Sequence, residues 1–261
     1  MSSDQEIMVF AHRGFSSRAP ENTMDAFQEA VHQGIPGIEL DVHRCASGEL
    51  VVFHDDHVRR ITGAEGIVDQ MDFQDLRRLD AGTWMDSRFS HLSIPLLEEV
   101  LDAFGTQCYW DIELKSRRKD DFGLAEGVVN LIQAYRLEQH CTISSFNPLQ
   151  LRFAEAHLNL PTAVIFAKDP EVPWYLRKGA GRLLTKGNIL KPEHIEISEK
   201  WMKRFHGRRG YDVWAWTVDE EQDILRMIEL GVQAVITNYP ERAMALIREH
   251  SAAHLQQSPQ I

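Results

Sequence analysis

Short apolar runs alternate along the chain with longer stretches in which apolar residues recur at helical spacing. The runs that we expect to form strands are 7–11, 37–41, 50–53, 109–112, 141–144, 162–166, 213–218 and 234–237. The amphipathic stretches expected to form helices are 22–32, 122–135, 148–157, 192–206 and 219–229, with a final helix that starts at Pro240. Repeated strand-then-helix units predict an α/β fold with a parallel sheet, and their number favours a closed (β/α)₈ TIM barrel over an open sheet.

Two segments break this alternation. Residues 55–95 are too irregular for one crossover helix and too short for an independent core, so we expect a small insertion between early barrel strands that covers part of the site mouth. Residues 168–190 fit either a helix or a strand, and one further strand is expected there. Residues 1–250 then form one domain, and the polar residues 251–261 are expected to be a frayed tail.

Polar side chains stand at the ends of several strand-like runs. Such positions are costly in a hydrophobic core, because burying an unpaired charge carries a heavy penalty. In a parallel barrel, however, the strand ends converge on one open face, where active sites lie. The polar set consists of His12, Arg13, Glu39, Asp41, His54, Glu113 and Lys115. We therefore expect these side chains to form one site.

Three carboxylates in this set are suited to a metal ion. Glu39 and Asp41 lie two residues apart and so point to the same side of a strand. Carboxylates this close repel each other unless a positive charge lies between them. A hard divalent cation fits this arrangement, and Glu113 would supply a third oxygen ligand. The weaker alternative is a pair of solvated surface acids.

The remaining residues of the set can move protons and bind an anion. His12 and His54 can take and give protons near neutral pH, because the ordinary pKa of histidine lies close to that range. An isolated histidine is more often structural, but two at strand ends favour catalysis. Arg13 and Lys115 could pair with the carboxylates, although their positions favour binding of phosphate, which arginine can grip with two parallel hydrogen bonds. The whole set indicates phosphoryl chemistry.

The net charge argues against some classes of binding partner, and the cysteine content favours one cellular compartment. The chain of 261 residues has a formal net charge of −11, which argues against a surface that attracts nucleic acid or anionic lipid. No stretch approaches the roughly 20 apolar residues of a membrane span, and the acidic N-terminal region does not resemble a secretory signal. Cys45, Cys108 and Cys141 have no C-x-x-C spacing, which favours reduced thiols in a cytoplasmic protein.

A series of short motifs runs through the chain in a specific order. They are AHRG at 11–14, PENT at 20–23, ELDV at 39–42, VFHD at 52–55, LDAG at 79–82, IPLLEE at 94–99, IELK at 112–115, SSF at 144–146, WAWTV at 214–218 and VITNYP at 235–240. From about Val9 to Arg242 the chain thereby resembles the glycerophosphodiester phosphodiesterase family, in its bacterial cytoplasmic type. Gln233-Ala234 and Asn238 depart from the Asp-Gly and Asp that family members often carry. The resemblance therefore does not predict the detail of the final loop.

The resemblance implies a barrel hydrolase that cleaves glycerophosphodiesters to sn-glycerol 3-phosphate and an alcohol. It implies acid and base roles for the two histidines, phosphate contacts for the two cations, and a divalent cation, Mg²⁺ or Ca²⁺, on Glu39, Asp41 and Glu113. Our hypothesis makes His12 the general base and His54 the general acid, although the residues alone do not decide between the two roles.

Two further residues are candidate substrate contacts. Glu21 belongs to a Pro-Glu-Asn-Thr run that also fits a simple helix start with Asn22 as the N-cap. Trp216 is expected to line the pocket against a carbon face of glycerol. Weaker candidates for supporting positions are Asp55, Phe146 and Lys186.

Several alternatives stay open. The nucleophile can be water or the glycerol 2-hydroxyl, which would give a cyclic intermediate, and the headgroup, the choice of cation and the oligomeric state are not predicted. One rival function is a lysophospholipase D, which would need an exposed apolar groove or a membrane-facing helix, and the sequence indicates neither. Another is a non-catalytic binding barrel, which would be expected to lack a histidine or a metal ligand, whereas this chain keeps all five.

Overall fold

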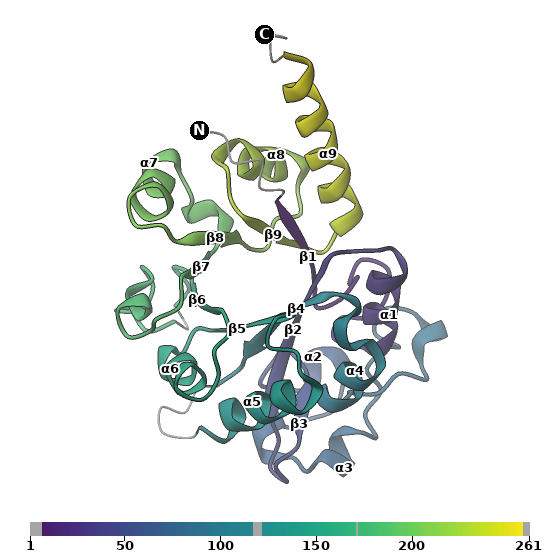
Figure 1. The fold of residues 1–261 in the computed structure, drawn as a ribbon. Helices are drawn as coiled ribbons and strands as arrows, with labels where there is room; N and C mark the ends of the chain where they lie inside the picture. The colour runs from purple at the N-terminus through teal and green to yellow at the C-terminus, as the bar shows by residue number, and fades with distance from the viewer. Residues whose placement is uncertain (1–6, 117–121, 171, 258–261) are drawn as a thin grey trace.

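The computed structural model describes residues 7–116, 122–170 and 172–257, and within them the chain forms a closed parallel barrel (Figure 1). Its eight strands are β1 (Met8–His12), β2 (Gly37–Arg44), β4 (Tyr109–Leu114), β5 (Cys141–Ser145), β6 (Thr162–Phe166), β7 (Ile189–Pro192), β8 (Asp212–Ala215) and β9 (Ala234–Thr237). Because β1 pairs with both β2 and β9, the sheet closes on itself. The predicted (β/α)₈ barrel is confirmed.

Helices surround the barrel on its outside (Figure 1). They include α1 (Met24–His32), α4 (Leu97–Phe104) with the 3-10 turn η3 (Gly105–Gln107), α5 (Gly123–Tyr135), α6 (Pro148–His157), α8 (Glu221–Leu230) and α9 (Pro240–Gln257). Phe27 of α1, Leu97 of α4 and Val128 of α5 share one apolar core with the outward-facing Ile38 and Ile112 of the strands. This burial of apolar surface holds the helices on the barrel.

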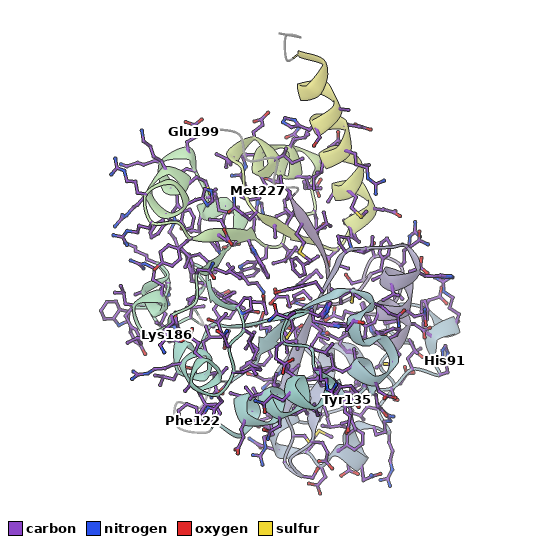
Figure 2. All side chains as sticks on the ribbon, viewed as in Figure 1. His91, Phe122, Tyr135, Lys186, Glu199 and Met227 are labelled. Carbon is purple, nitrogen blue, oxygen red and sulfur yellow. The ribbon has the colours of Figure 1, made fainter. Side chains whose placement is uncertain are left out.

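Alternation along each strand places polar residues inside the barrel. Ile38 of β2 packs outward against the helices. Because side chains alternate along a strand, Glu39 and Asp41 point into the barrel, near its mouth. Deeper in the barrel, an apolar cluster includes Phe10 and Trp214, whose ring centroids lie 4.8 Å apart. Side chains fill the space inside the ring of strands (Figure 2). The interior is therefore a packed core, with Glu39 and Asp41 near its mouth.

The strand before His54 is not a barrel strand, contrary to the expectation from sequence. β3 (Leu50–Val52) runs antiparallel to the distal end of β2. β2 is long enough to continue beyond its pairing with β1, so the chain can turn and pair back on it. This return brings the backbone N–H of Phe53 to the carbonyl of Asp41 at 3.0 Å. His54 thus reaches the site from an antiparallel excursion rather than from the end of a parallel strand.

The residues after β3 form short helical pieces rather than one crossover helix. The pieces are α2 (Arg59–Thr62), η1 (Val68–Gln70), α3 (Phe73–Leu76) and η2 (Ser87–Phe89). Val58, Leu76 and Ile94 pack with Phe53 in a small apolar cluster of their own. In Figure 1 this segment lies next to β2 and β3, on one side of the barrel.

Among the residues described between β6 and β7, 167–170 and 172–188, no standard crossover helix is present. These residues contain the 3-10 turn η4 (Ala180–Leu183), and β7 begins only at Ile189, so just the last two residues of 168–190 belong to the extra strand expected there. The helix predicted for 192–206 therefore starts later, after η5 (His194–Glu196), as α7 (Glu199–Met202) followed by the π-helical η6 (Lys203–Gly207). Pro192 is still in the parallel ladder, and the side chain of Ser198 caps α7 by accepting from the N–H of Trp201.

Large apolar side chains of the same segment are exposed, which was not expected from the sequence. Trp174 is 79% and Leu183 is 73% exposed, and Tyr175 and Leu184 are exposed as well. Contiguous exposed apolar patches often mark interaction sites, and within this segment the rings of Trp174 and Tyr175 are in contact, with centroids 5.7 Å apart. Among the residues described here, no helix has both the length and the apolar character needed to span a membrane.

The C-terminal helix is longer than expected. α9 continues to Gln257, so residues 251–257 are helical where a frayed tail was predicted. Polar composition was a poor guide here, because Ala, Leu and Gln, which make up most of this stretch, have high helix propensities. The end of α9 extends away from the barrel (Figure 1).

Candidate active site

Glu39 and Asp41 of β2 and Glu113 of β4 form a buried carboxylate cluster at the barrel mouth. The register of the two strands sets Asp41 opposite Glu113. Each of the three residues offers an oxygen, and these oxygens lie within 4.8 Å of one another. The residues are only 2%, 1% and 8% exposed, respectively. The three carboxylates singled out in the sequence therefore converge in space.

Burial and mutual repulsion make this cluster costly without a compensating cation. Burial raises the pKa of Glu39 well above its usual range, and the Asp41 carboxylate raises it further, against the opposing charge of Lys191. Burial has the same effect on Asp41, but neighbouring cationic groups, Lys115 first, outweigh it and lower the pKa of Asp41 well below its usual range. A hard divalent cation bound by oxygen ligands would relieve the repulsion, so this donor set fits such an ion.

Both predicted phosphate-binding cations contact the carboxylates. Lys115 Nζ donates to Glu113 Oε1 at 2.8 Å and lies 3.3 Å from Asp41 Oδ1. Arg13 donates through Nη1 to Glu21 Oε1 at 2.8 Å, and its Nε lies 3.3 Å from Asp41 Oδ2. Burial lowers the pKa of each cation, but the surrounding carboxylates outweigh it and raise the pKa of both. Lys115 and Arg13 therefore keep their charge beside the cluster.

A strained turn after β1 positions Arg13. Arg13 and Asn22 adopt left-handed backbone conformations, with φ of 58° and 56°, which non-glycine residues rarely adopt and which cost about 1–3 kcal/mol each. The strain allows the N–H of Arg13 to donate to Glu39 Oε2 at 3.1 Å. Asn22 is held by Asp41, whose Oδ2 accepts from Asn22 Nδ2 at 2.8 Å. Such strain is typical of functional sites.

Glu21 and Asn22 differ in position from the simple helix start considered above. The N-cap of α1 is Thr23, whose side chain accepts from the N–H of Ala26, so the assignment of Asn22 as N-cap was wrong. Asn22 is buried and faces the carboxylates instead. Glu21 bridges Arg13 and Arg60, with Arg60 Nη2 at 2.7 Å. Burial raises the pKa of Glu21, but the hydrogen bonds and charges of Arg60 and Arg13 outweigh it and lower this pKa.

His12 ends β1 and is largely enclosed by the site. Its Nδ1 lies 2.9 Å from Asn238 Oδ1, at the end of β9. Burial, followed by the positive charge of Arg13, lowers the pKa of His12 to about 3, against the opposing effect of Asp41. His12 is therefore neutral at pH 7. Asn238 was noted in the sequence only as a departure from a family motif, and its contact with His12 was not predicted.

His54 has a different partner. Its Nδ1 lies 2.6 Å from Asp55 Oδ1, and Asp55 also accepts from Arg60 Nε at 2.6 Å. Burial raises the pKa of Asp55, but hydrogen bonds from His54 and Arg60 outweigh it and lower this pKa. Asp55, a weak candidate in the sequence, thus directly supports His54.

A buried ion pair that the sequence analysis missed lies one layer deeper in the barrel. Lys191 of β7 is 2% exposed and donates to Asp111 Oδ2 at 2.5 Å and to Ser144 Oγ at 3.0 Å. Asp111 precedes Glu113 by two residues on β4 and pairs in register with Glu39. A lysine at a strand end was the available signal, but it could not be used because the limits of β7 were not recognised.

The three remaining candidates lie in different places. Trp216 follows β8, and its Nε1 donates to the carbonyl of Lys191 at 2.8 Å. The ring of Phe146 meets Trp216 edge-on, with centroids 5.8 Å apart. Lys186 is exposed and lies before β7, at the opposite end of that strand from the site, where its N–H donates to Glu155. Lys186 is therefore not a supporting residue.

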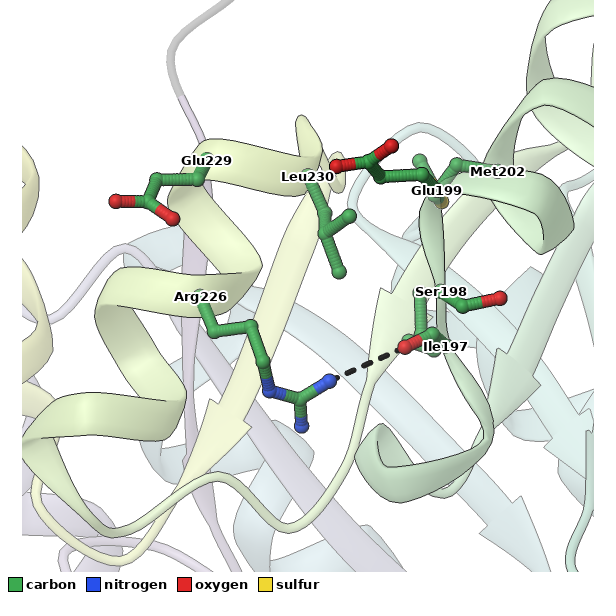
Figure 3. Close-up of a pocket in the computed structure, with 7 residues that line it drawn as sticks. All are labelled: Ile197, Ser198, Glu199, Met202, Arg226, Glu229 and Leu230. Atoms are coloured by element: carbon green, nitrogen blue, oxygen red, sulfur yellow. Dashed lines mark hydrogen bonds between the residues drawn. The ribbon is translucent and has the colours of Figure 1, made fainter.

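A cavity of about 590 Å³ lies outside the barrel mouth, between α7 and α8 (Figure 3). Arg226 Nη1 donates to the carbonyl of Ile197 at its edge. The cavity is lined by Ile197, Ser198, Glu199, Met202, Arg226, Glu229 and Leu230. None of the catalytic or binding candidates described above lines it, so these candidates belong to the barrel mouth and not to this cavity.

The chain matches a protein family over most of its length. The matching family is described as the glycerophosphoryl diester phosphodiesterase family, and the match covers residues 12–242. A glycerophosphodiester phosphodiesterase of Caldanaerobacter subterraneus subsp. tengcongensis is 35% identical over 248 residues, which cover 94% of this chain and 99% of the relative. One from Bacillus altitudinis is 32% identical over 245 residues, covering 92% of this chain and 98% of the relative.

A solved structure resembles the fold closely. It is that of an Oleispira antarctica phosphodiesterase in complex with the product sn-glycerol 3-phosphate. The two chains share 26% sequence identity with a TM-score of 0.82, over 93% of this chain and 97% of the other. Both kinds of comparison therefore point in the same direction as the site geometry.

Proposed function

Because the chain belongs to the glycerophosphoryl diester phosphodiesterase family, we propose that its carboxylate site hydrolyses glycerophosphodiesters to sn-glycerol 3-phosphate and an alcohol. The enzyme is a metal-dependent phosphoric diester hydrolase. The observation that carries the proposal is the buried cluster of Glu39, Asp41 and Glu113, with cations and histidines gathered around it. The product bound by the Oleispira antarctica phosphodiesterase agrees with this substrate class.

Glu39, Asp41 and Glu113 would hold the divalent cation, which we propose to be Mg²⁺ or Ca²⁺. When bound, such an ion stabilises negative charge on phosphoryl oxygens and orients the substrate. Lys115, at 2.8 Å from Glu113, adds a fixed positive charge beside these carboxylates. Isothermal titration of the chelator-treated protein with each ion measures which one binds more tightly.

His12 is proposed as the general base and His54 as the general acid. The lowered pKa of His12 keeps its imidazole neutral, so it can accept a proton from the nucleophile. His54 Nδ1 lies 2.6 Å from the carboxylate of Asp55, which holds the ring in place to give a proton to the leaving alcohol. Water and the glycerol 2-hydroxyl are both candidate nucleophiles, and accumulation of a cyclic glycerophosphate distinguishes the second route.

Arg13 is proposed to bind a non-bridging phosphate oxygen together with Lys115. Arg13 Nε is buried 3.3 Å from Asp41 Oδ2, and within the part of the chain that the structure describes this contact is not a well-aligned hydrogen bond. An unsatisfied buried N–H is unfavourable, and a phosphate oxygen would satisfy it. Glu21 is proposed to hold the other side of the guanidinium in place, and Trp216 to contact the carbon face of glycerol.

Release of sn-glycerol 3-phosphate tests the function. The purified protein is assayed with glycerophosphocholine and glycerophosphoethanolamine, and we expect turnover that a chelator abolishes and that Mg²⁺ or Ca²⁺ restores. A wider panel of alcohol headgroups then defines the preference. Absence of turnover of every diester in the presence of both metals would contradict the proposal.

A lysophospholipid is a second candidate substrate class. The observation that favours it is the exposed apolar segment with Trp174 and Leu183, which supplies the kind of surface that an acyl chain needs. Rates on glycerophosphocholine and on lysophosphatidylcholine are compared for the wild type and for Trp174→Ser. A selective loss on the lysolipid supports this candidate, and negligible turnover of the lysolipid by the wild type rejects it.

We propose a cytoplasmic location. Cys45, Cys108 and Cys141 are all free and buried, as expected for a protein in a reducing compartment. Fractionation of the native host, followed by detection of the protein in each fraction, tests this location.

A further inference from the structure

The hydrogen bonds of Asn238 determine which way its side-chain amide points. Asn238 Nδ2 donates to Asp219 Oδ2 at 2.6 Å, and the backbone N–H of Asn238 donates to Asp219 Oδ1 at 2.9 Å. Thr237 Oγ1 donates to the same Oδ1 at 3.0 Å, which holds the carboxylate in place. Because carboxylate oxygens accept hydrogen bonds, the NH₂ group of Asn238 has to face Asp219.

The oxygen of the same amide therefore faces His12. Asn238 Oδ1 lies 2.9 Å from His12 Nδ1, and it also accepts from Ser16 Oγ at 2.7 Å. An amide oxygen can only accept, so Nδ1 of His12 has to carry the hydrogen. In a neutral imidazole the other nitrogen, Nε2, then keeps its lone pair.

We propose that Asp219 and Asn238 are positioning residues that hold His12 in the Nδ1-protonated tautomer and leave Nε2 free to accept the proton of the nucleophile. The inference rests on the proposed function of His12 as general base, and it adds to the site two residues that act through His12. Asp219 lies in the loop after β8 and Asn238 directly after β9. The end of the last barrel strand thereby controls a residue on the first.

The two histidines have different partners. His54 Nδ1 lies 2.6 Å from the carboxylate of Asp55. His12 Nδ1 faces the neutral amide of Asn238, and the charged Asp219 contacts that amide. The amide oxygen of Asn238 accepts the hydrogen bond from Nδ1 and thereby fixes the orientation and the tautomer of the ring.

Exchange of the two polar groups tests the proposal. In Asp219→Asn, two NH₂ groups would face each other unless the amide of Asn238 turns over, which presents a donor to His12 and forces the opposite tautomer. The double variant Asp219→Asn/Asn238→Asp restores every donor and acceptor with the positions of amide and carboxylate exchanged. Ser16→Ala is the matched control, because it removes a hydrogen bond to Asn238 Oδ1 without a reason for the amide to turn.

The first readout does not depend on activity. Histidine-selective ¹⁵N labelling, with His12 assigned by comparison with His12→Gln, measures the protonation of each ring nitrogen at neutral pH in the presence of Mg²⁺ or Ca²⁺. We expect a protonated Nδ1 and an unprotonated Nε2 in the wild type, and the reverse in Asp219→Asn. The opposite tautomer in the wild type overturns the proposal even if no variant folds.

The second readout is the rate on glycerophosphocholine. We expect kcat of Asp219→Asn to fall by about 10²-fold or more with KM changed only a few-fold, since the contribution of a general base is about 10²–10⁴-fold. The double variant should recover most of this loss, and Ser16→Ala should stay within a few-fold of the wild type. A folded double variant that is as impaired as Asp219→Asn rejects the proposal that Asp219 and Asn238 set the tautomer of His12. Absence of wild-type turnover would instead reject the proposed function and leave the ¹⁵N result to be judged separately.

Discussion

At the scale of single residues, the two histidines should respond differently to the leaving group of the substrate. Replacement of His54 by Gln removes the proton donor, so we expect a loss of about 10²–10⁴-fold in rate on glycerophosphocholine. A nitrophenyl diester has a leaving group that needs no proton, and on it the same variant should lose far less. His12→Gln should impair both substrates alike. Equal impairment of the His54 variant on the two substrates would show that the acid assignment is wrong.

The ion pair of Lys191 and Asp111 provides a second prediction, on stability. Lys191→Met leaves the buried Asp111 carboxylate without its cation, and breaking a buried pair in this way costs about 3–5 kcal/mol of unfolding free energy. The loss is measured by urea unfolding. Lys186→Met, on the exposed loop before β7, is the control and should stay within about 0.5 kcal/mol. The double change Lys191→Met/Asp111→Leu should recover much of the loss; if it is less stable than the single variant, the pair is not the cause.

At the scale of elements, the turn after β1 depends on Gly14. Gly14 has φ of 81°, and a Cβ there would lie 2.7 Å from the Cβ of Ala26 in α1. Gly34 also has a positive φ, 66°, but nothing lies within 4 Å of the corresponding Cβ. Gly34→Ala should therefore cost only backbone strain, about 1–2 kcal/mol, and Gly14→Ala about 1–3 kcal/mol more through overpacking. Denaturant unfolding of both variants measures the difference, and equal losses would refute the role of the contact with α1.

The elements also show why the sequence predicted much of the fold and site, but not all of it. Each ligand candidate follows an apolar run in a repeated pattern, so barrel class and the convergence of Glu39, Asp41 and Glu113 could be inferred from local sequence. His54 was expected near the site because it follows an apolar run that predicted a parallel barrel strand. The structure shows that this run, β3, turns back and pairs antiparallel with β2, and local sequence does not reveal strand direction. The role of Asn238 was out of reach, since its hydrogen bonds to Asp219 and His12 join separate loops.

At the scale of the whole molecule, the site joins parts of the chain that are far apart in sequence. β1, β2 and β4 contribute His12 and the three carboxylates, and the excursion after β3 contributes His54. β9 closes the ring against β1 and supplies Asn238. The site therefore exists only in the closed barrel, and a ligand that binds these carboxylates together should favour the folded state over the unfolded one.

Metal binding should consequently stabilise the whole fold. A divalent cation at about 100 times its Kd is expected to add about 2.7 kcal/mol to the unfolding free energy, provided that the unfolded chain does not bind it. Thermal unfolding of the chelator-treated protein should therefore show a Tm that rises with the concentration of Mg²⁺ or Ca²⁺. Glu39→Gln/Asp41→Asn should abolish this rise, because it removes two ligands, while it also relieves the repulsion between two buried carboxylates. Glu98→Gln, on the helix α4 outside the barrel, is the control and should keep the full metal-dependent shift. A Tm that rises equally in the double variant would place the binding of the cation somewhere other than this cluster.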